Sequence, residues 1–212
     1  MPYKTIKKPK VRTSPKKKDE VESDEETAEL VTCDENHIYF YDWVNSKSIL
    51  ALIYYIKTVN TKLKILKTDV EAKYGSVVNF NIYLHINSCG GYVTDAFAAI
   101  DCIKKSEFPI ISIVEGYAAS AATFLSVVCH KRQITPFSSM LIHQLSSVSV
   151  GTFEQLEDDH ANNNYLLDSM KKLYNTHSKG KLNNKLLEKV LKHDLMWSAQ
   201  RCLQYGLVDE IL

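Results

Sequence analysis

The chain has 212 residues, of which 45% are hydrophobic and 24% charged, enough for one substantial hydrophobic core. Its 26 Lys and Arg residues nearly balance its 25 Asp and Glu residues, which argues against a general nucleic-acid-binding surface. The five cysteines have no metal-ligand spacing, so we expect free thiols, a reducing compartment such as the cytoplasm, and no metal or other cofactor.

Residues 1–29 differ in composition from the rest of the chain. Residues 1–18 hold eight Lys or Arg and no acid, and residues 19–29 hold seven Asp or Glu and no base. We expect a disordered, solvated tail or a propeptide, and the segment lacks the apolar core of a signal peptide. Its basic block is also compatible with nuclear or organelle targeting. Residues 30–212 are predicted to form one domain.

A short strand is predicted at Ile38–Phe40, followed by a helix over Ser46–Val59. Leu50, Ile53 and Tyr54 give this helix an apolar face. The polar stretch Asn60–Ser76 is expected to be partly loop.

A clean alternation of apolar and polar residues predicts a strand over Val78–Ile86, and Thr94–Ser106 has the apolar periodicity of a helix. Between them lies Asn87–Gly91, which ends in a glycine pair. Such a pair allows the backbone to turn its N–H groups toward a ligand, although it is also an ordinary turn.

The segment Ile110–Val128 carries the most informative pattern. An apolar β-branched run leads to Gly116, then to small residues around Ser120, and then to a helix-forming run. A serine at the start of a helix lies beside unpaired backbone N–H groups, which favour an oxyanion. The alternative is a helix N-cap in a tightly packed turn. Glu115 and Gly116 argue against a membrane span here.

Two later segments complete the pattern. His143 ends the strand-like run Met140–Gln144, where it is either a general base or an ordinary structural histidine. Thr152–Ser178 is a long helix candidate with a heptad-like seam that either meets a partner helix or packs on its own core. The seam consists of Phe153, Leu156, His160, Asn163, Leu167, Met170 and Tyr174.

Together these motifs resemble the Clp protease proteolytic subunit family, ClpP, over residues 30–212. The family's Gly-x-Ala-Ala-Ser lies at Gly116–Ser120, and its Asn-Ser-Pro-Gly-Gly-x-Val lies at Asn87–Val93 with Cys89 in place of Pro. Its Pro-x-Ser-x-x-x-Ile-His-Gln matches residues 136–144. Asp194 precedes a Trp-Ser-Ala stretch at the position of the family's catalytic Asp, and residues 205–212 resemble the family's C-terminal ending.

The resemblance implies an α/β fold of the crotonase/ClpP type, with stacked βαβ units and a protruding helical handle. It implies that Ser120 is the nucleophile, that His143 is the base and that Asp194 orients the histidine. The backbone N–H groups of Gly91 and Ala121 would then form the oxyanion hole.

The implied function is a serine endopeptidase that hydrolyses unfolded polypeptides inside an oligomeric chamber. The resemblance implies a heptameric ring or a double ring of fourteen, fed by an AAA+ unfoldase, without nucleic-acid or membrane partners. Lys192 and His193 stand where the family commonly has an acidic residue and Arg, and Ala122 replaces a usual Gly. Three alternatives remain: a catalytically silent subunit of a mixed ring, a stand-alone peptidase and a crotonase-type acyl-CoA enzyme.

Overall fold

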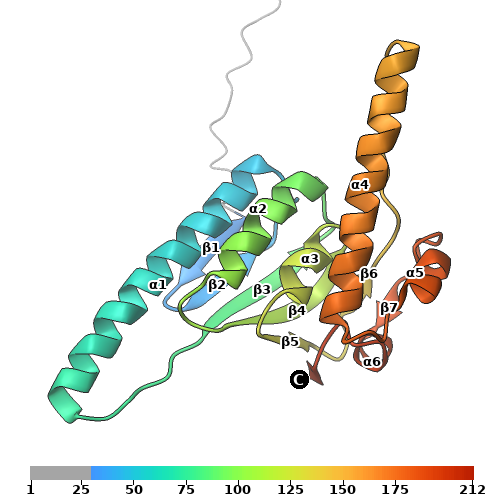
Figure 1. Cartoon of the computed structure of the whole chain (residues 1–212). Coiled ribbons are helices and arrows are strands. Elements are labelled where there is room, and N and C mark those ends of the chain that lie inside the picture. The colour runs from blue at the N-terminus through green and yellow to red at the C-terminus, as the bar shows by residue number, and fades with distance from the viewer. Residues whose placement is uncertain (1–29) are drawn as a thin grey trace, which may run out of the picture.

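The computed structural model describes residues 30–212, so the expectations for the tail of residues 1–29 lie outside the described part of the chain. The described chain opens with an antiparallel hairpin of β1 (Val31–Asp34) and β2 (His37–Phe40). Strand β2 then joins a larger parallel sheet by pairing with β3 (Ile82–Ser88) (Figure 1).

The sheet is predominantly parallel, and its strand order is β1-β2-β3-β4-β5-β8. Strand β4 (Ile110–Ala119) lies between β3 and β5 (Lys131–Ile134), and β8 (Glu210–Ile211) forms the far edge. The end of β4 also pairs with β6 (Ser139–Leu141), which pairs in turn with the antiparallel β7 (Trp197–Ser198). Parallel strands joined through helices confirm the expected α/β class.

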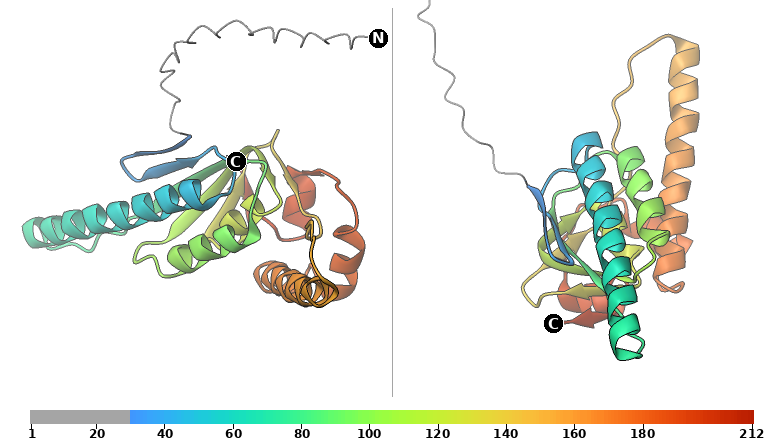
Figure 2. Two further views of the ribbon diagram at one scale, coloured as in Figure 1. Left: turned by 90° about the horizontal axis from the view of Figure 1, so that it is seen from above. Right: turned by 90° about the vertical axis from the view of Figure 1, so that its left-hand side faces the viewer.

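Two helices, α1 (Ser46–Tyr74) and α2 (Val93–Lys104), cover one face of the sheet, as Figures 1 and 2 show. The short helix α3 (Ala122–Val127) is entirely buried and packs beside α2. The buried faces of these helices and the inward side chains of β2, β3 and β4 form one apolar core.

Helix α1 is longer than expected: of the stretch Asn60–Ser76, which was expected to be partly loop, only Gly75 and Ser76 lie outside the helix. The buried stripe of α1 continues through Val59 and Leu63. Asn60 does not end the helix but connects it to the segment after α2. Its side-chain amide donates to the Ser106 hydroxyl, and its Oδ1 accepts a hydrogen bond from the Phe108 N–H. Packing and these hydrogen bonds stabilise the helix as far as Tyr74. Gly75, in the left-handed conformation with φ 67°, then forms its C-cap.

The predicted strand over Val78–Ile86 begins four residues late, at Ile82, and continues to Ser88. Its neighbours explain the difference. Strand β2 starts at His37, which pairs with Tyr83, and β4 starts at Ile110, which pairs with Ile82. Residues 78–81 therefore have the alternating apolar and polar pattern of a strand, but no neighbouring strand pairs with them.

The long helix expected over Thr152–Ser178 is α4 (Phe153–His177), which protrudes from the body as the handle (Figures 1 and 2). The seam is divided along its length. Met170 and Tyr174 are buried in the subunit's own core, where the Tyr174 hydroxyl bonds Thr123 Oγ1 at 2.7 Å. Phe153 and Leu156, nearer the tip, are exposed.

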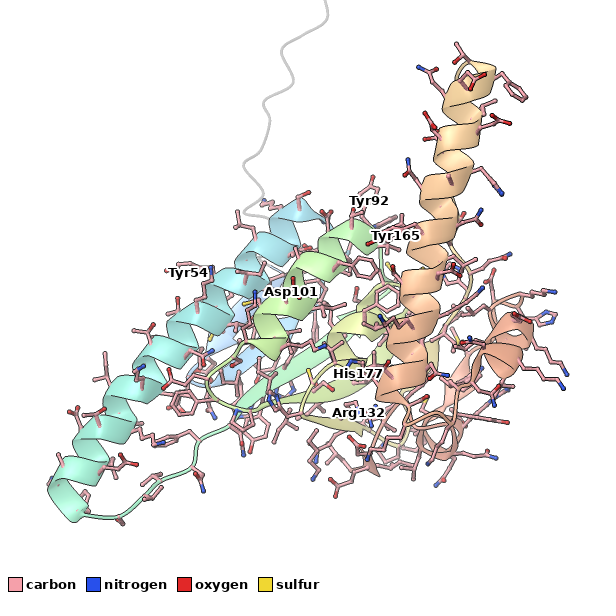
Figure 3. All side chains as sticks on the ribbon, in the orientation of Figure 1. Tyr54, Tyr92, Asp101, Arg132, Tyr165 and His177 are labelled. Carbon is pink, nitrogen blue, oxygen red and sulfur yellow. The ribbon has the colours of Figure 1, made fainter. Side chains whose placement is uncertain are left out.

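The C-terminal segment closes the fold through α5 (Asn184–Val190), α6 (Ala199–Gln204) and β8. Buried Arg132 on β5 binds both carboxylate oxygens of Asp209 and donates to the carbonyls of His177 and Gly206. Figure 3 shows Arg132 and His177 together at the base of α4. Within residues 30–212, no helix is long and apolar enough to cross a membrane.

Candidate active site

Ser120 lies in a tight turn between β4 and α3, just before the helix rather than within its first turn. Its φ of 52° is in the left-handed region, which a non-glycine residue rarely adopts. A serine held in such a strand–turn–helix elbow projects its hydroxyl above the end of the sheet. The strain of this backbone geometry is typical of functional positions.

Hydrogen bonds on both sides hold the elbow in place. The Ser120 N–H donates to the Leu141 carbonyl at 2.8 Å, and the Ser120 carbonyl accepts the Thr123 backbone N–H at 3.0 Å and the Thr123 hydroxyl at 2.6 Å. The Ser120 hydroxyl is bonded to no other side chain in the described chain. The backbone is therefore fixed while the oxygen is available for chemistry.

Strand pairing brings His143 beside Ser120. Strand β6 runs parallel to the end of β4, with Ala119 opposite Leu141. Ser120 follows Ala119 directly and His143 comes two residues after Leu141, so both lie just past the ends of adjacent strands. The Gln144 N–H donates to the Leu191 carbonyl at 2.7 Å, which anchors the chain just after the histidine. The imidazole is largely buried, with 24% of its side chain exposed.

Asp194 lies on the connection between α5 and β7 and approaches the other side of His143. Its Oδ1 is 3.7 Å from Nδ1 of His143, and 80% of the aspartate side chain is exposed. This distance is beyond the range of a hydrogen bond but within that of an ion pair. The structure thus brings Asp194 and His143 together, and no hydrogen bond joins His143 to Ser120 among residues 30–212.

The glycine loop passes directly against the elbow. A Cβ on Gly90 would lie 2.5 Å from the Ala119 carbonyl oxygen and 2.7 Å from Ser120 Cβ, so only glycine fits at this position. The same point is 3.1 Å from the backbone nitrogen of Ala121. The loop that carries Gly91 therefore lies next to Ser120 and Ala121, as an oxyanion hole built from these backbones requires.

A segment that the sequence did not indicate braces this loop. Ser88 Oγ donates to the Asp42 carbonyl at 2.6 Å, the Val44 N–H donates to the Gly90 carbonyl at 2.7 Å, and the Tyr92 N–H donates to the Val44 carbonyl at 2.9 Å. Only pairing in the folded chain relates residues 42–45 to a loop more than forty residues away. No local motif in the sequence marks them.

A thiol and a phenol also lie near the site. Cys89, which stands in the glycine loop, is exposed and free. Burial raises the pKa of Tyr117, and the nearby Cys89 and Asp194 raise it further. Tyr117 therefore remains protonated at neutral pH.

A separate polar cluster crosses strands β2, β3 and β4. His37 bonds His85 at 2.9 Å, His85 bonds Glu115 at 2.9 Å, and the Tyr41 hydroxyl donates to Glu115 at 2.6 Å. Burial alone would raise the pKa of Glu115, but the hydrogen bonds from Tyr41 and His85 outweigh it and lower that pKa. Within the described chain, no group of three His, Cys, Asp or Glu side chains is placed to hold a metal ion.

The chain is similar in sequence to known proteins. The sequence profile of the Clp protease family matches residues 51–212, a span that contains Gly91, Ser120, His143 and Asp194. The ATP-dependent Clp protease proteolytic subunit 1 of Protochlamydia amoebophila is 34% identical over 131 residues, which are 60% of this chain and 63% of that protein.

Two other relatives are similar to the same degree. Proteolytic subunit 3 of Synechococcus sp. is 33% identical over 136 residues, 62% of this chain and 66% of the relative. Proteolytic subunit 1 of Chlamydia trachomatis serovar D is 32% identical over 131 residues, 60% of this chain and 67% of the relative. The match thus spans about two thirds of the length of each relative.

Proposed function

The chain belongs to the Clp protease family, and from this we propose that it is a serine endopeptidase whose nucleophile is Ser120. The observation that supports this most strongly is the left-handed backbone of Ser120 at an elbow between β4 and α3. Glu35 and Lys179 have a similar φ in turns, but Ser120 combines it with a strand–turn–helix elbow, which projects the side chain above the end of the sheet.

The roles of the surrounding groups follow from their chemistry. His143 takes the Ser120 hydroxyl proton through Nε2 as the serine oxygen attacks the scissile carbonyl carbon. The developing oxyanion accepts hydrogen bonds from the Gly91 and Ala121 N–H groups. His143 then gives its proton to the departing amine as the C–N bond breaks, and a water molecule hydrolyses the resulting serine ester by the same route.

Asp194 is proposed to orient His143 and to stabilise its protonated form. At 3.7 Å from Nδ1 the carboxylate is not hydrogen-bonded in this state. A small movement of the exposed connection that carries Asp194 would close the pair when substrate binds, since catalytic hydrogen bonds often tighten only in the complex.

A catalytically silent subunit of a mixed ring is the second candidate. The observations that favour it are the long His143–Asp194 separation and the absence, in residues 30–212, of a hydrogen bond between Ser120 and His143. An active serine reacts covalently with a fluorophosphonate and an unactivated serine does not. Labelling of Ser120 therefore separates the two functions.

We also propose that the subunits form a ring, singly or as a double ring of fourteen. The exposed aromatic and aliphatic residues near the tip of the handle, Phe153 and Leu156, support a contact with another subunit. Lys192 and His193 change the charge pattern expected for contacts between rings. Native mass spectrometry tests the ring, because assemblies of seven or fourteen copies support it and a monomer contradicts it.

The proposed substrates are unfolded polypeptides, delivered by an ATP-dependent unfoldase. A closed chamber would admit short peptides freely and extended chains slowly, and it would exclude folded proteins. Hydrolysis of a fluorogenic peptide by the protein alone, together with survival of a stably folded protein, is the expected result. Rapid degradation of the folded protein without ATP would contradict an enclosed site.

A further inference from the structure

We propose that Trp43 is a positioning residue for the reaction, because it holds the glycine loop so that the Gly91 N–H faces the oxyanion. The inference rests on the peptidase function proposed above. It concerns a side chain outside the residues matched by the family profile, which begin at residue 51.

The first observation is the contact between Trp43 and Gly91. A Cβ on Gly91 would overlap Nε1 and Cδ1 of the Trp43 indole and also the Val44 carbonyl oxygen, so the indole and this carbonyl together cover the face of Gly91 where a side chain would be. Gly91 has φ 150°, a conformation that L side chains rarely adopt and that glycine adopts without steric cost. The indole closes one side of that backbone.

The second observation is that Trp43 itself is rigidly attached. Its carbonyl accepts the Ser48 hydroxyl at 2.5 Å and the Asn45 side-chain amide at 3.1 Å, and its N–H donates to Asp42 Oδ1 at 2.6 Å. Ser48 belongs to the first turn of α1, which Asn45 caps. The Trp43 backbone is thus anchored to the start of a long, packed helix.

The third observation is that burial in the core does not explain the indole. Trp43 is 56% exposed, and its ring N–H is bonded to no group of the described chain. A large aromatic residue left this exposed adds little to the core. Within the described chain, the indole packs against Gly91, the predicted oxyanion donor.

Substitution of Trp43 tests this positioning role, which should affect kcat and leave KM nearly unchanged. Loss of one oxyanion donor lowers kcat by about 100- to 1,000-fold. Loosening the donor without removing it should cost less, so Trp43→Ala should lower kcat for a short fluorogenic peptide about tenfold and change KM less than about twofold. Trp43→Phe keeps a flat ring on Gly91 and should remain within about threefold of the unmodified protein.

Fluorescence gives a second readout that does not depend on the variants' activity. Of the two tryptophans, Trp197 is buried at 1% exposure and Trp43 is exposed. Reaction of Ser120 with a fluorophosphonate places a phosphonyl oxygen at the oxyanion position beside Gly91. The emission of Trp43 should therefore shift on labelling, and the shift should be absent from labelled Trp43→Phe.

The matched control is Tyr74→Ala, which removes an equally exposed aromatic residue at the far end of α1 and should leave kcat and labelling unchanged. Circular dichroism and native mass must match for all variants. Equal kcat for Trp43→Ala and the unmodified protein, a drop in Trp43→Phe as large as that in Trp43→Ala, or an unchanged emission on labelling would overturn the inference. If the unmodified protein neither labels nor hydrolyses, the proposed function fails and the inference falls with it.

Discussion

Nδ1 of His143 lies 3.7 Å from Oδ1 of Asp194, on a carboxylate that is 80% exposed. A buried aspartate would be bonded to the histidine at 2.7 to 3.2 Å in a site already assembled for catalysis. Here the nucleophile's backbone is fixed while the third member of the proposed triad is within reach of its partner but not bonded to it. In the proposed mechanism, catalysis depends on closure of the Asp194 connection.

Replacing the carboxylate of Asp194 should show that dependence. Asp194→Asn should lower kcat by at least about 100-fold, because the amide neither stabilises the imidazolium nor selects the productive tautomer. Asp168→Asn is the control, since Asp168 is equally exposed on the handle and pairs only with Lys171. Steady-state hydrolysis of a short peptide measures the effect, and comparable rates for the two variants would argue against a role for Asp194.

The left-handed backbone of Ser120 predicts an unusual stability difference between two inactive variants. Ser120→Ala keeps the strained φ of 52°, whereas Ser120→Gly adopts it without steric cost. We expect Ser120→Gly to be more stable than Ser120→Ala by about 1 kcal/mol, although both lose activity. Thermal unfolding of the pair measures this. A lower Tm for Ser120→Gly would mean that the elbow is not strained.

Features of the site that lie within one short segment of the chain could be predicted from the sequence. The elbow, the glycine loop and the position of His143 at a strand end each appear as a short pattern, and the folded chain places all three together. Residues 42–45 could not be recognised this way, because their bonds to the glycine loop cross more than forty residues. The predicted helix was shorter than α1 for the same reason, because the hydrogen bond between Asn60 and Ser106 joins residues far apart in the sequence.

Arg132 should be the main polar contributor to the stability of the C-terminal segment. Its guanidinium binds both oxygens of Asp209 and two backbone carbonyls, a geometry that Lys cannot reproduce. Arg132→Lys should lower the free energy of unfolding by about 2 kcal/mol, as expected for lost hydrogen bonds to a charged group. Urea unfolding measures it, with Lys131→Arg on the exposed side of the same strand as the control. An unchanged midpoint for Arg132→Lys would contradict the assignment.

The same pair predicts a pH dependence of folding. Hydrogen bonds from Arg132 hold the pKa of Asp209 below its usual value of 3.8. Because the folded-state pKa is lowered, the stabilisation is present above the unfolded-state pKa and is lost as the pH falls through the folded-state value. Asp209→Asn should therefore lose stability at neutral pH and show a weaker pH dependence below pH 4. Parallel acid-unfolding curves for the two proteins would be evidence against this linkage.

The divided seam of α4 predicts two different effects of a charge on the handle. Met170→Glu should lower the free energy of unfolding by more than about 3 kcal/mol, because Met170 is 3% exposed in the subunit core. Leu156→Glu, at an exposed position nearer the tip, should leave the fold intact and reduce the assembled mass.

Circular dichroism and sedimentation distinguish the two effects. Phe153→Glu should behave like Leu156→Glu, because Phe153 is also exposed near the tip. An assembly of unchanged mass in both exposed-site variants would show that the handle's tip does not form the subunit contact. Leu167 is only partly buried against the core, so Leu167→Glu should fall between the two classes.

The central claim is that Ser120 is an activated nucleophile, and covalent labelling of the purified full-length protein tests it most directly. A fluorophosphonate probe followed by peptide mass spectrometry should find the adduct on Ser120, with none in Ser120→Ala and a strongly reduced rate in His143→Ala. Ser126, which is buried on α3, serves as an internal control and should remain unlabelled. An unmodified Ser120, in a folded and assembled sample that a reactive serine protease labels readily alongside, would contradict the account.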